Sequence, residues 1–593
     1  MFLNIYVIRQ YQYFKKLSAA GTHISRFFDK LKILKRVKLK NIKNQPIMER
    51  YNLTLNKIWQ YVKEINGDVE VAHLPPHGNN IRSTYAREYE RTLRLADGLR
   101  RLGIGPGDKV ATMDWNTIWH FDLYWAVPAM GAILHPLNVR LAPEDLVYII
   151  NHAGDKALVY HRDFAPLVEK IRPYLKTVQI YIQISDGAGA VGKDPEIEDV
   201  MKSGEPRPFP DLSEDTIATI GYTSGTTGKP KGAYFTHRAL TLHTLSSALM
   251  FSVARGFARP ECAEEVCTFL QLVPMFHVHG WGTPWTFALM GWRQVYPGRF
   301  DPNHVVKLIA EERVKSLAGV PTMLYMLLTA PEFPKYVNRI REVKPIFVVG
   351  GAALPKELAK RAAEAGFIPR VGYGLTETAP VLTLGYFRPT EKLPQDVEEY
   401  YSVLTATGLP IPLVDLAVVD ENLNPVPRDG RTMGEIVVKA PWVTPEYLGD
   451  PEKTKESFRG GWFRTGDVAV WYPDGRIRIV DRAKDVIKSG GEWISSLQLE
   501  DLIATHPAVA QVAVIGVPHE KWGERPVAVV VLKPGAAATE QDIINHLQKF
   551  VDAGKIPKWW LPDKVIFVNQ LPLTGTGKID KKVLKEQFRN TLK

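Results

Sequence analysis

Residues 221–232 read Gly-Tyr-Thr-Ser-Gly-Thr-Thr-Gly-Lys-Pro-Lys-Gly, and this segment constrains the fold more than any other in the chain. An apolar run at 216–220 precedes it, so we expect a strand that leads into a glycine-rich loop. Glycines let successive backbone N–H groups point into one concave site, where hydroxyl and ammonium groups add further donors. The segment therefore predicts an anion-binding loop. Its expected donors are Thr223, Ser224, Gly225, Thr226, Thr227, Gly228 and Lys231.

Two other glycine-rich motifs do not fit this segment. No Gly-Lys pair in the chain is followed by Ser or Thr, as the loop of P-loop NTPases requires. The segment also lacks the Gly-x-Ser-x-Gly spacing of a nucleophile elbow. An ordinary surface loop is the remaining alternative, and the density of Gly, Thr and Lys argues against it.

Residues 222–232 resemble the phosphate loop of the adenylate-forming superfamily, which includes acyl-CoA synthetases, firefly luciferases and the adenylation domains of nonribosomal peptide synthetases. Further motifs of that superfamily follow in the same order, and the resemblance runs from about residue 50 to the C-terminus. It implies that the loop holds the β- and γ-phosphates of ATP, with Thr223 and Glu377 at a Mg²⁺ ion. For acyl-CoA synthetases it also implies coenzyme A as co-substrate.

Short apolar runs alternate with helical patterns up to about residue 480, and a second, smaller pattern of this kind follows a charged stretch. We therefore predict an α/β fold. It comprises a large N-terminal domain of several subdomains, with distorted sheets and helices, and a small mobile α+β C-terminal domain. The expected parts are a basic extension at 1–47, an ATP- and acyl-binding domain at 48–480, a hinge at 481–486 and a lid domain at 487–593.

Individual elements follow from the same patterns. Strands are expected at 109–113, 157–160, 178–184, 216–222, 345–349, 435–439, 509–517, 527–532 and 564–568, and helices at 83–101, 143–152, 355–365, 496–506 and 539–550. The apolar stretch at 123–134 contains Pro128 and is flanked by Asp122 and His135, so it predicts a buried helix rather than a membrane span.

Two segments predict the nucleotide pocket. Residues 372–378 read Gly-Tyr-Gly-Leu-Thr-Glu-Thr, and residues 350–352 read Gly-Gly-Ala. An aromatic ring beside a glycine can stack on a nucleobase, and a carboxylate near phosphates can bind Mg²⁺. The resemblance implies that Tyr373 lies against adenine, Thr376 near the α-phosphate and Glu377 on the metal. The expected walls of the pocket are Gly351, Ala352, Gly372 and Gly374.

Residues 464–467 read Arg-Thr-Gly-Asp and resemble the motif whose aspartate accepts hydrogen bonds from the ribose hydroxyls. A carboxylate suits two donors because it is purely an acceptor. The residue in question is Asp467, and an ordinary turn aspartate is the alternative.

Residues 481–485 resemble the hinge of the superfamily, in which Arg482 would reach the ribose or a phosphate and Lys484 stands at the pivot. A hinge is needed because two half-reactions share one acyl group, so the C-terminal domain must close over ATP and then rotate. The following segment resembles the medium- and long-chain fatty-acyl branch, and its expected thiol-channel residues are Gly490, Gly491 and Trp493.

Lys578 lies in a Gly-Thr-Gly-Lys segment near the C-terminus. Carboxylate attack on the α-phosphate increases negative charge on its non-bridging oxygens, and a lysine directed at them stabilises the transition state. The resemblance implies this catalytic role for Lys578, whereas many other lysines are simply solvated.

Residues 274–281 resemble the segment that borders the acyl pocket in the superfamily, with His277 at its aromatic or histidine position. Phe276 and Trp281 could line an apolar tunnel, with Trp281 as its gate, or could equally be core residues.

Residues 1–47 contain eleven Lys or Arg residues and one acid, Asp29, and so hold +10 of the net charge of +11. The remaining chain is nearly neutral, which argues against nucleic-acid binding. Within the basic segment 1–47, four apolar residues repeat at helical spacing: Phe27, Leu31, Leu34 and Val37. Three interpretations stay open: peripheral membrane contact, a transit peptide, or a misassigned start with Met48 as the natural first residue.

The two cysteines, Cys262 and Cys267, exclude a disulfide framework and suit a reducing compartment. We expect core or loop roles for both, and a cytoplasmic protein that is free or peripheral to a membrane. The resemblance also suggests a homodimer.

The motifs together predict an ATP-dependent fatty acid–CoA ligase that forms an acyl-adenylate and pyrophosphate, then acyl-CoA and AMP. Alternatives within the superfamily are an aromatic, amino-acid or short-chain acid ligase and a luciferase-type oxygenase. A catalytically silent binding protein on this fold and an ADP-forming kinase are alternatives from other classes.

Overall fold

The computed structural model describes residues 51–189, 191–223, 229–253, 266–388, 390–490, 492–572 and 579–592. The chain from Asn52 to Lys593 clusters into one compact unit, distinct from Met1–Tyr51. The predicted basic extension at 1–47 lies outside the described residues. No helix within the described ranges is long and apolar enough to cross a membrane.

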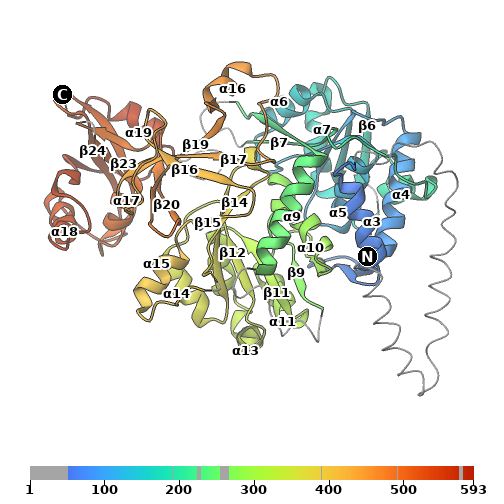
Figure 1. Cartoon of the computed structure of the whole chain (residues 1–593), viewed down its shortest axis with the longest axis horizontal. Helices are drawn as coiled ribbons and strands as arrows, with labels where there is room; N and C mark the ends of the chain where they lie inside the picture. The colour runs from blue at the N-terminus through green and yellow to red at the C-terminus, as the bar shows by residue number, and fades with distance from the viewer. Residues whose placement is uncertain are drawn as a thin grey trace, which may run out of the picture. The chain divides into compact units, whose positions relative to one another are not determined.

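A six-stranded sheet with its helices forms the first part of this unit (Figure 1). Its strand order is β6-β5-β3-β4-β7-β8, and every neighbouring pair is parallel except β7 and β8. The strands are β3 (Lys109–Met113), β4 (Ile133–Pro136), β5 (Ala157–His161), β6 (Ile180–Ile184), β7 (Ile217–Tyr222) and β8 (Gly232–Thr236). The helices are α3 (Leu55–Ile65), α4 (Tyr85–Arg101), α5 (Ile118–Ala129), α6 (Pro143–Ala153), α7 (Ala165–Ile171) and α8 (Ile197–Ser203).

A nine-stranded sheet follows, in the order β15-β14-β13-β12-β11-β9-β10-β1-β2. The six strands from β13 to β1 in this order are mutually parallel. The strands are β1 (Glu70–His73), β2 (Ile81–Thr84), β9 (Thr268–Leu270), β10 (Arg293–Tyr296), β11 (Val314–Gly319), β12 (Ile346–Val349), β13 (Ile368–Gly374), β14 (Val381–Leu384) and β15 (Leu409–Pro410). The helices are α9 (His237–Val253), α10 (Thr283–Leu289), α11 (Pro302–Glu311), α12 (Pro321–Leu328), α13 (Phe333–Val343), α14 (Lys356–Glu364) and α15 (Val397–Leu404).

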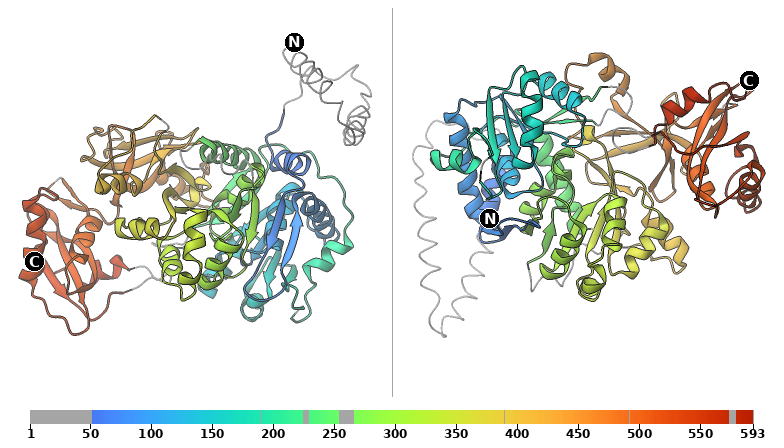
Figure 2. Two further views of the ribbon diagram at one scale, coloured as in Figure 1. Left: turned by 90° about the horizontal axis from the view of Figure 1, so that it is seen from below. Right: turned by 180° about the vertical axis from the view of Figure 1, so that it is seen from behind.

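Different helices pack against the two faces of this sheet. Successive side chains of a strand point to opposite faces, so neighbouring residues of one strand contact different helices. Leu317 and Phe347 pack in one core cluster with residues of α11 to α14. Ala318 and Val348, one position further along β11 and β12, belong to a second cluster with residues of α9 and α10. Both groups of helices can be followed in Figures 1 and 2.

Two smaller sheets complete the chain. The first contains β16 (Asp415–Val419), β17 (Met433–Lys439), β18 (Phe458–Arg459), β19 (Trp462–Trp471) and β20 (Ile477–Arg482), with α16 (Pro451–Ser457) between β17 and β18. The second contains β21 (Ile487–Ser489), β22 (Glu492–Ile494), β23 (Val509–His519), β24 (Gly523–Leu532) and β25 (Lys564–Phe567), with α17 (Ser496–Ala504), α18 (Glu540–Asp552) and α19 (Lys581–Gln587). The second has core clusters of its own. The predicted fold class, a large N-terminal and a smaller C-terminal α/β domain, is confirmed.

Two sequence expectations need correction. The helix expected at 83–101 begins only at Tyr85, because Ile81–Thr84 forms β2 and the Thr84 hydroxyl caps the helix by accepting from the Arg87 amide. The helix expected at 123–134 is Ile118–Ala129, and β4 begins at Ile133. Every residue of α5 is buried, so its apolar run does not mark where the helix ends.

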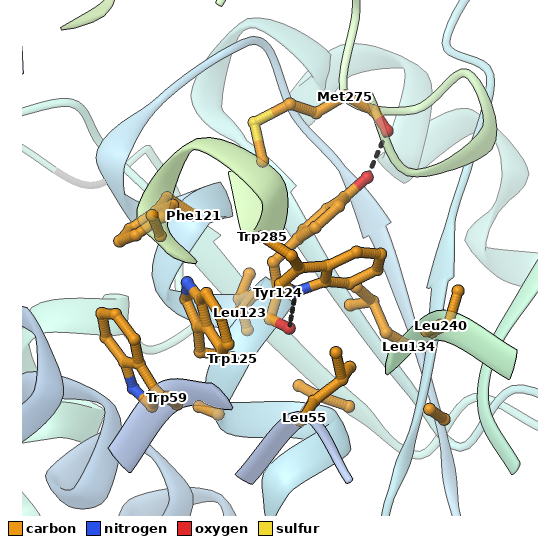
Figure 3. Close-up of a cluster of buried hydrophobic side chains, with 14 of the residues drawn as sticks. Leu55, Trp59, Phe121, Leu123, Tyr124, Trp125, Leu134, Leu240, Met275 and Trp285 are labelled. Carbon is orange, nitrogen blue, oxygen red and sulfur yellow. Dashed lines mark hydrogen bonds between the residues drawn. The ribbon is translucent and has the colours of Figure 1, made fainter. Parts of the chain in front are cut away.

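The core around α5 also fixes a distant segment (Figure 3). Trp59 and Trp125 stack with ring centroids 4.2 Å apart. The Tyr124 hydroxyl donates to the Met275 carbonyl, and the Trp285 Nε1–H donates to the Tyr124 carbonyl at 3.3 Å. The chain between Met275 and Trp285 is therefore anchored to the core at both ends.

Cys267 is buried, in agreement with the core role expected for it, and it is also disulfide-bonded. Cys262, the other cysteine of the chain, lies outside the described residues.

Candidate active site

A cavity of about 2130 Å³ brings together most of the predicted site residues that the structure describes. Those that line it are Thr223, Lys231, His277, Trp281, Gly351, Ala352, Gly372, Tyr373, Gly374, Thr376, Glu377, Arg482 and Lys484. Those that do not line it are Phe276, Asp467, Gly490 and Trp493. Those that lie outside the described residues are Ser224, Gly225, Thr226, Thr227, Gly228, Gly491 and Lys578.

Hydrogen bonds between Thr223 and Lys231 join the two ends of the phosphate-loop segment. The Thr223 amide donates to the Lys231 carbonyl at 2.9 Å, and the Lys231 amide donates to the Thr223 hydroxyl at 3.1 Å. These contacts extend the antiparallel pairing of β7 with β8. The sheet thus holds both ends of the loop at the cavity wall.

Tyr222, the last residue of β7, connects this hairpin to α6. Its hydroxyl lies 2.7 Å from His152 Nδ1. Burial raises the pKa of Tyr222 and lowers the pKa of His152, so at neutral pH the phenol donates to a neutral imidazole. The His152 ring stacks on Tyr148, one helical turn away, and Lys229 Nζ lies 4.8 Å from the centroid of the Tyr148 ring. Sequence reasoning missed this support, since no local motif contains it.

Glu377 has a hydrogen-bond partner, Tyr447, that the sequence did not reveal. The Tyr447 hydroxyl donates to Glu377 Oε1 at 2.6 Å, and both residues line the cavity. Burial and the adjacent carboxylate raise the pKa of Tyr447, so its hydroxyl stays protonated as the donor. Lys231 Nζ lies 4.8 Å from the centroid of the same ring. Glu377 Oε2 accepts no hydrogen bond from any described residue and remains available in the cavity.

Asp467 lies behind the cavity wall with an exposed fraction of 2%. Its carboxylate accepts from the Tyr373 hydroxyl at 2.7 Å and pairs with Arg482 Nε at 2.9 Å. Burial raises the pKa of Asp467, and the Arg482 guanidinium opposes that shift. In this arrangement Tyr373 and Arg482, rather than Asp467 itself, are exposed to the cavity.

The chain at Val278–Gly282 forms a left-handed turn. All five residues have positive φ, with values of 33°, 60°, 55°, 60° and 72°. For residues with a β-carbon this conformation costs about 1–2 kcal/mol each. The core contacts of Met275 and Trp285 hold the turn in place, as strained backbone requires. Its effect is to direct Trp281 into the cavity, where the indole packs against Gly350 so closely that a β-carbon there would lie 2.7 Å from it.

A group of cavity residues lies between the sheet and the helices α9 and α10. Three phenylalanine rings are stacked, with centroids 3.9 Å apart for Phe269 and Phe287 and 5.3 Å apart for Phe251 and Phe287. We call this group the phenylalanine compartment. Its residues are Ser247, Phe251, Phe269, Phe287, Ser316 and Ala318. Phe276, which was predicted to line a tunnel, is instead buried beside the cavity with its ring 4.9 Å from that of His277.

The hinge segment is held from both sides. The Asp481 carboxylate accepts from the amide and the hydroxyl of Ser496, at 2.6 and 2.8 Å, at the start of α17. Lys585 of α19 donates to the Lys484 carbonyl at 2.8 Å. Gly490 and Trp493 lie in the β21–β22 hairpin, away from the cavity, and Gly490 packs under Trp522.

Comparisons with known proteins agree with this geometry. Residues 65–448 match the AMP-binding enzymes, and residues 498–578 match the C-terminal domain of AMP-binding enzymes. A long-chain-fatty-acid–CoA ligase of Thermus thermophilus is 42% identical, over 90% of this chain and 96% of its own length. A 3-methylmercaptopropionyl-CoA ligase of Ruegeria pomeroyi is 38% identical, over 91% of this chain and 98% of its own.

Among solved structures, a fatty acyl CoA synthetase of Mycobacterium tuberculosis aligns with a TM-score of 0.68 and 30% identity, covering 91% of this chain and 99% of that one. The family match covers more than half of the chain and includes the phosphate loop and the Glu377 motif. The chain therefore belongs to the AMP-binding, adenylate-forming enzymes and is an AMP-forming acid–CoA ligase that uses ATP and coenzyme A.

Proposed function

We propose that this ligase acts on fatty acids. The acid and ATP would give acyl-AMP and pyrophosphate, and coenzyme A would then give acyl-CoA and AMP. The observation that carries the proposal is the continuity of one cavity from the ends of the phosphate loop to the phenylalanine compartment. A compartment of aromatic and small side chains suits an alkyl chain, because it removes apolar surface from water. Two of the relatives act, by their names, on acids of different kinds, so the acid itself has to be measured.

The first half-reaction would take place among the cavity residues. The loop closed by Thr223 and Lys231 would hold the phosphates, and Thr376 would lie near the reacting phosphorus. Glu377 fits a Mg²⁺ ion, because a carboxylate oxygen without a hydrogen-bond donor faces the cavity and hard cations prefer oxygen ligands. When bound, that ion neutralises charge on the phosphates. We assign Lys578 to the developing charge on the α-phosphate.

The second half-reaction would require rotation of the C-terminal domain about 481–486. In this structure Gly490 and Trp493 do not line the cavity, so they could border a thiol channel only after such a movement. Rotation would have to change the contact between Arg482 and Asp467 or that between Asp481 and Ser496. Asp481 and Arg482 are adjacent in the chain, so a pivot between them would separate these two contacts.

The experiment that tests the proposal measures AMP release with ATP, Mg²⁺ and coenzyme A over acids from acetate to long-chain fatty acids. A CoA-dependent maximum at medium or long chains supports it. AMP only with aromatic or short acids would move the substrate to those classes. ADP as product, or no nucleotide product with any acid, would contradict the proposal.

Replacing Tyr222 with Phe should weaken ATP binding more than turnover. The substitution removes the hydroxyl bonded to His152 and leaves the ring in place. A hydrogen bond of this kind contributes about 1 kcal/mol, so we expect the KM for ATP to rise roughly fivefold. Steady-state kinetics with varied ATP measure this, with Tyr234→Phe, whose hydroxyl bonds exposed Glu446, as the control. An unchanged KM for ATP would show that the contact does not support the loop.

Replacing Trp281 with Ala should broaden the acyl preference. The indole occupies the space beside Gly350 at the edge of the sheet, where an acyl chain would enter the phenylalanine compartment. Alanine tolerates the left-handed backbone no better than tryptophan does, so the turn itself gains no new strain. Relative kcat/KM over a series of chain lengths is the readout. A profile identical to that of the unmodified enzyme would reject a gating role.

A further inference from the structure

The floor of the phenylalanine compartment is one face of the nine-stranded sheet. Phe269 of β9 and Ser316 of β11 are register partners, so their side chains lie next to each other on that face. Ala318, two residues further along β11, points the same way. Its register partner on β12 is Val348, which also lines the cavity. The acyl path therefore runs down a flat wall of small and aromatic side chains.

The register also gives the depth of the compartment. β11 ends at Gly319, whose carbonyl accepts a hydrogen bond from the Gly350 amide at 3.1 Å. Gly350 directly precedes Gly351, an expected wall residue of the nucleotide pocket. Ser316 lies three residues before the end of β11, and a strand rises about 3.3 Å per residue, so Ser316 is about 10 Å deeper. The stacked rings of Phe251, Phe269 and Phe287 lie at the same depth as Ser316. An acyl chain that enters the compartment at the level of Gly319 would thus meet the three phenylalanine rings after about 10 Å, roughly the length of a medium-length acyl chain.

Two hydroxyl groups in this compartment have no partner. Ser316 has an exposed fraction of 0% and Ser247 of 4%, and neither hydroxyl makes a hydrogen bond within the described part of the chain. Ser247 lies one turn of α9 before Phe251, so the two side chains share one face of that helix, and both line the cavity. Leaving a buried hydroxyl unpaired is costly, so such groups normally meet a polar partner. Both residues line the cavity, so a substrate that fills the compartment would supply this partner.

The compartment carries no charge that would select an anionic group. None of its six residues is ionisable, and the neighbouring elements, α9 and the turn at Val278–Gly282, each carry a buried imidazole, His243 and His279. Burial lowers the pKa of each of these histidines to about 3, so both are neutral at physiological pH. A second carboxylate on the substrate would therefore be buried without a cation, which is unfavourable. A neutral hydrogen-bonding group would be matched.

We infer that the enzyme selects medium-length acids that carry a neutral oxygen function, a hydroxyl or an oxo group, at the distal end of the chain. The inference rests on the proposed function and refines its substrate class. Ser316 and Ser247 are its specificity-determining residues: they hydrogen-bond the distal oxygen, while the three phenylalanines limit the length. A plain alkyl chain of the same length would leave both hydroxyls unpaired.

The test compares alkanoic acids from butyrate to dodecanoate with their ω-hydroxy counterparts, by AMP release in the presence of coenzyme A. A site built to bond a hydroxyl discriminates strongly against analogues without one, so we expect kcat/KM to be at least about tenfold higher for the best ω-hydroxy acid. Ser316→Ala should reduce that ratio to about one, and Ser247→Ala should lower it by a smaller factor.

Thr244→Val is the matched control, because Thr244 is a buried residue of α9 whose hydroxyl also lacks a partner but which does not line the cavity. It should leave the ratio unchanged. Equal kcat/KM for both series, or a ratio unaffected by Ser316→Ala and Ser247→Ala, would mean that only water meets these hydroxyls and would overturn the inference while leaving the ligase intact. No AMP with any acid would overturn the proposed function as well.

Discussion

Lys578→Ala should abolish acyl-adenylate formation while sparing thioester formation from supplied acyl-AMP. The carboxylate and the α-phosphate are both negative, and the pentavalent transition state concentrates charge on the phosphate oxygens. A single cation or donor directed at such charge accelerates the step by about 10²–10³. We therefore expect ATP–pyrophosphate exchange to fall by at least about 100-fold. The second half-reaction breaks the acyl–phosphate bond without ATP, so it should remain within about a factor of three of the original rate.

The two half-reactions can be measured separately, which makes the prediction specific. Pyrophosphate exchange reports only the first step, and CoA consumption from synthetic acyl-AMP reports only the second. Lys549→Ala is a suitable control, because Lys549 is an exposed lysine of α18 in the same domain. Equal losses in both half-reactions would instead indicate a damaged domain, and normal exchange would refute the assignment of Lys578.

The sequence predicted the walls of the cavity well because each wall is a short contiguous motif. Gly372 lies near the end of β13, and Gly351 and Thr376 each come two residues after β12 and β13, whose parallel pairing brings their ends to one edge. A motif that is local in sequence is local in space, so order along the chain was sufficient. The elements that were predicted, such as β3, β5 and α18, follow from a similar reason, since burial of one face imposes a period that can be recognised. Others, such as β9, β11 and β13, were not predicted.

The supporting residues could not be predicted because they are distant in sequence. Tyr222 and His152 are 70 residues apart, and so are Tyr447 and Glu377. The sequence around a tyrosine at the end of a strand or after a loop does not show which distant residue it will contact. That contact depends on how the elements are arranged in space. Asp467 shows the opposite error: its motif was recognised, but the sequence did not reveal that Tyr373 and Arg482 already bind its carboxylate.

The left-handed turn at Val278–Gly282 shows where tertiary structure overrides local preference. Gly280 and Gly282 hint at unusual backbone, but valine, histidine and tryptophan normally avoid positive φ. The anchoring of Met275 and Trp285 to Tyr124 supplies the constraint, and it involves a helix more than 150 residues earlier in the chain. Strain of this kind, held by packing, is found where a side chain must be placed for function.

Glu377→Gln should cause the second large loss and should change the metal requirement. The amide is nearly the same size as the carboxylate, and its oxygen can still accept from the Tyr447 hydroxyl, so the local packing is retained. What disappears is the negative charge at the oxygen that faces the cavity. Mg²⁺ is a hard cation that binds carboxylates in preference to neutral amides. We expect kcat/KM to fall by about 100-fold and the Mg²⁺ concentration for half-maximal activity to rise by about tenfold.

Adenylation rates over a range of Mg²⁺ concentrations measure both effects. Glu446→Gln provides the control, because that exposed carboxylate also accepts a hydrogen bond from a tyrosine, Tyr234, at 3.1 Å but does not line the cavity. Its kinetics should not change. If Glu377→Gln lowered the rate without shifting the Mg²⁺ dependence, Glu377 would act through Tyr447 and the adjoining Lys231 rather than through the metal. The shift in Mg²⁺ requirement, and not the loss of activity alone, therefore decides the role of this residue.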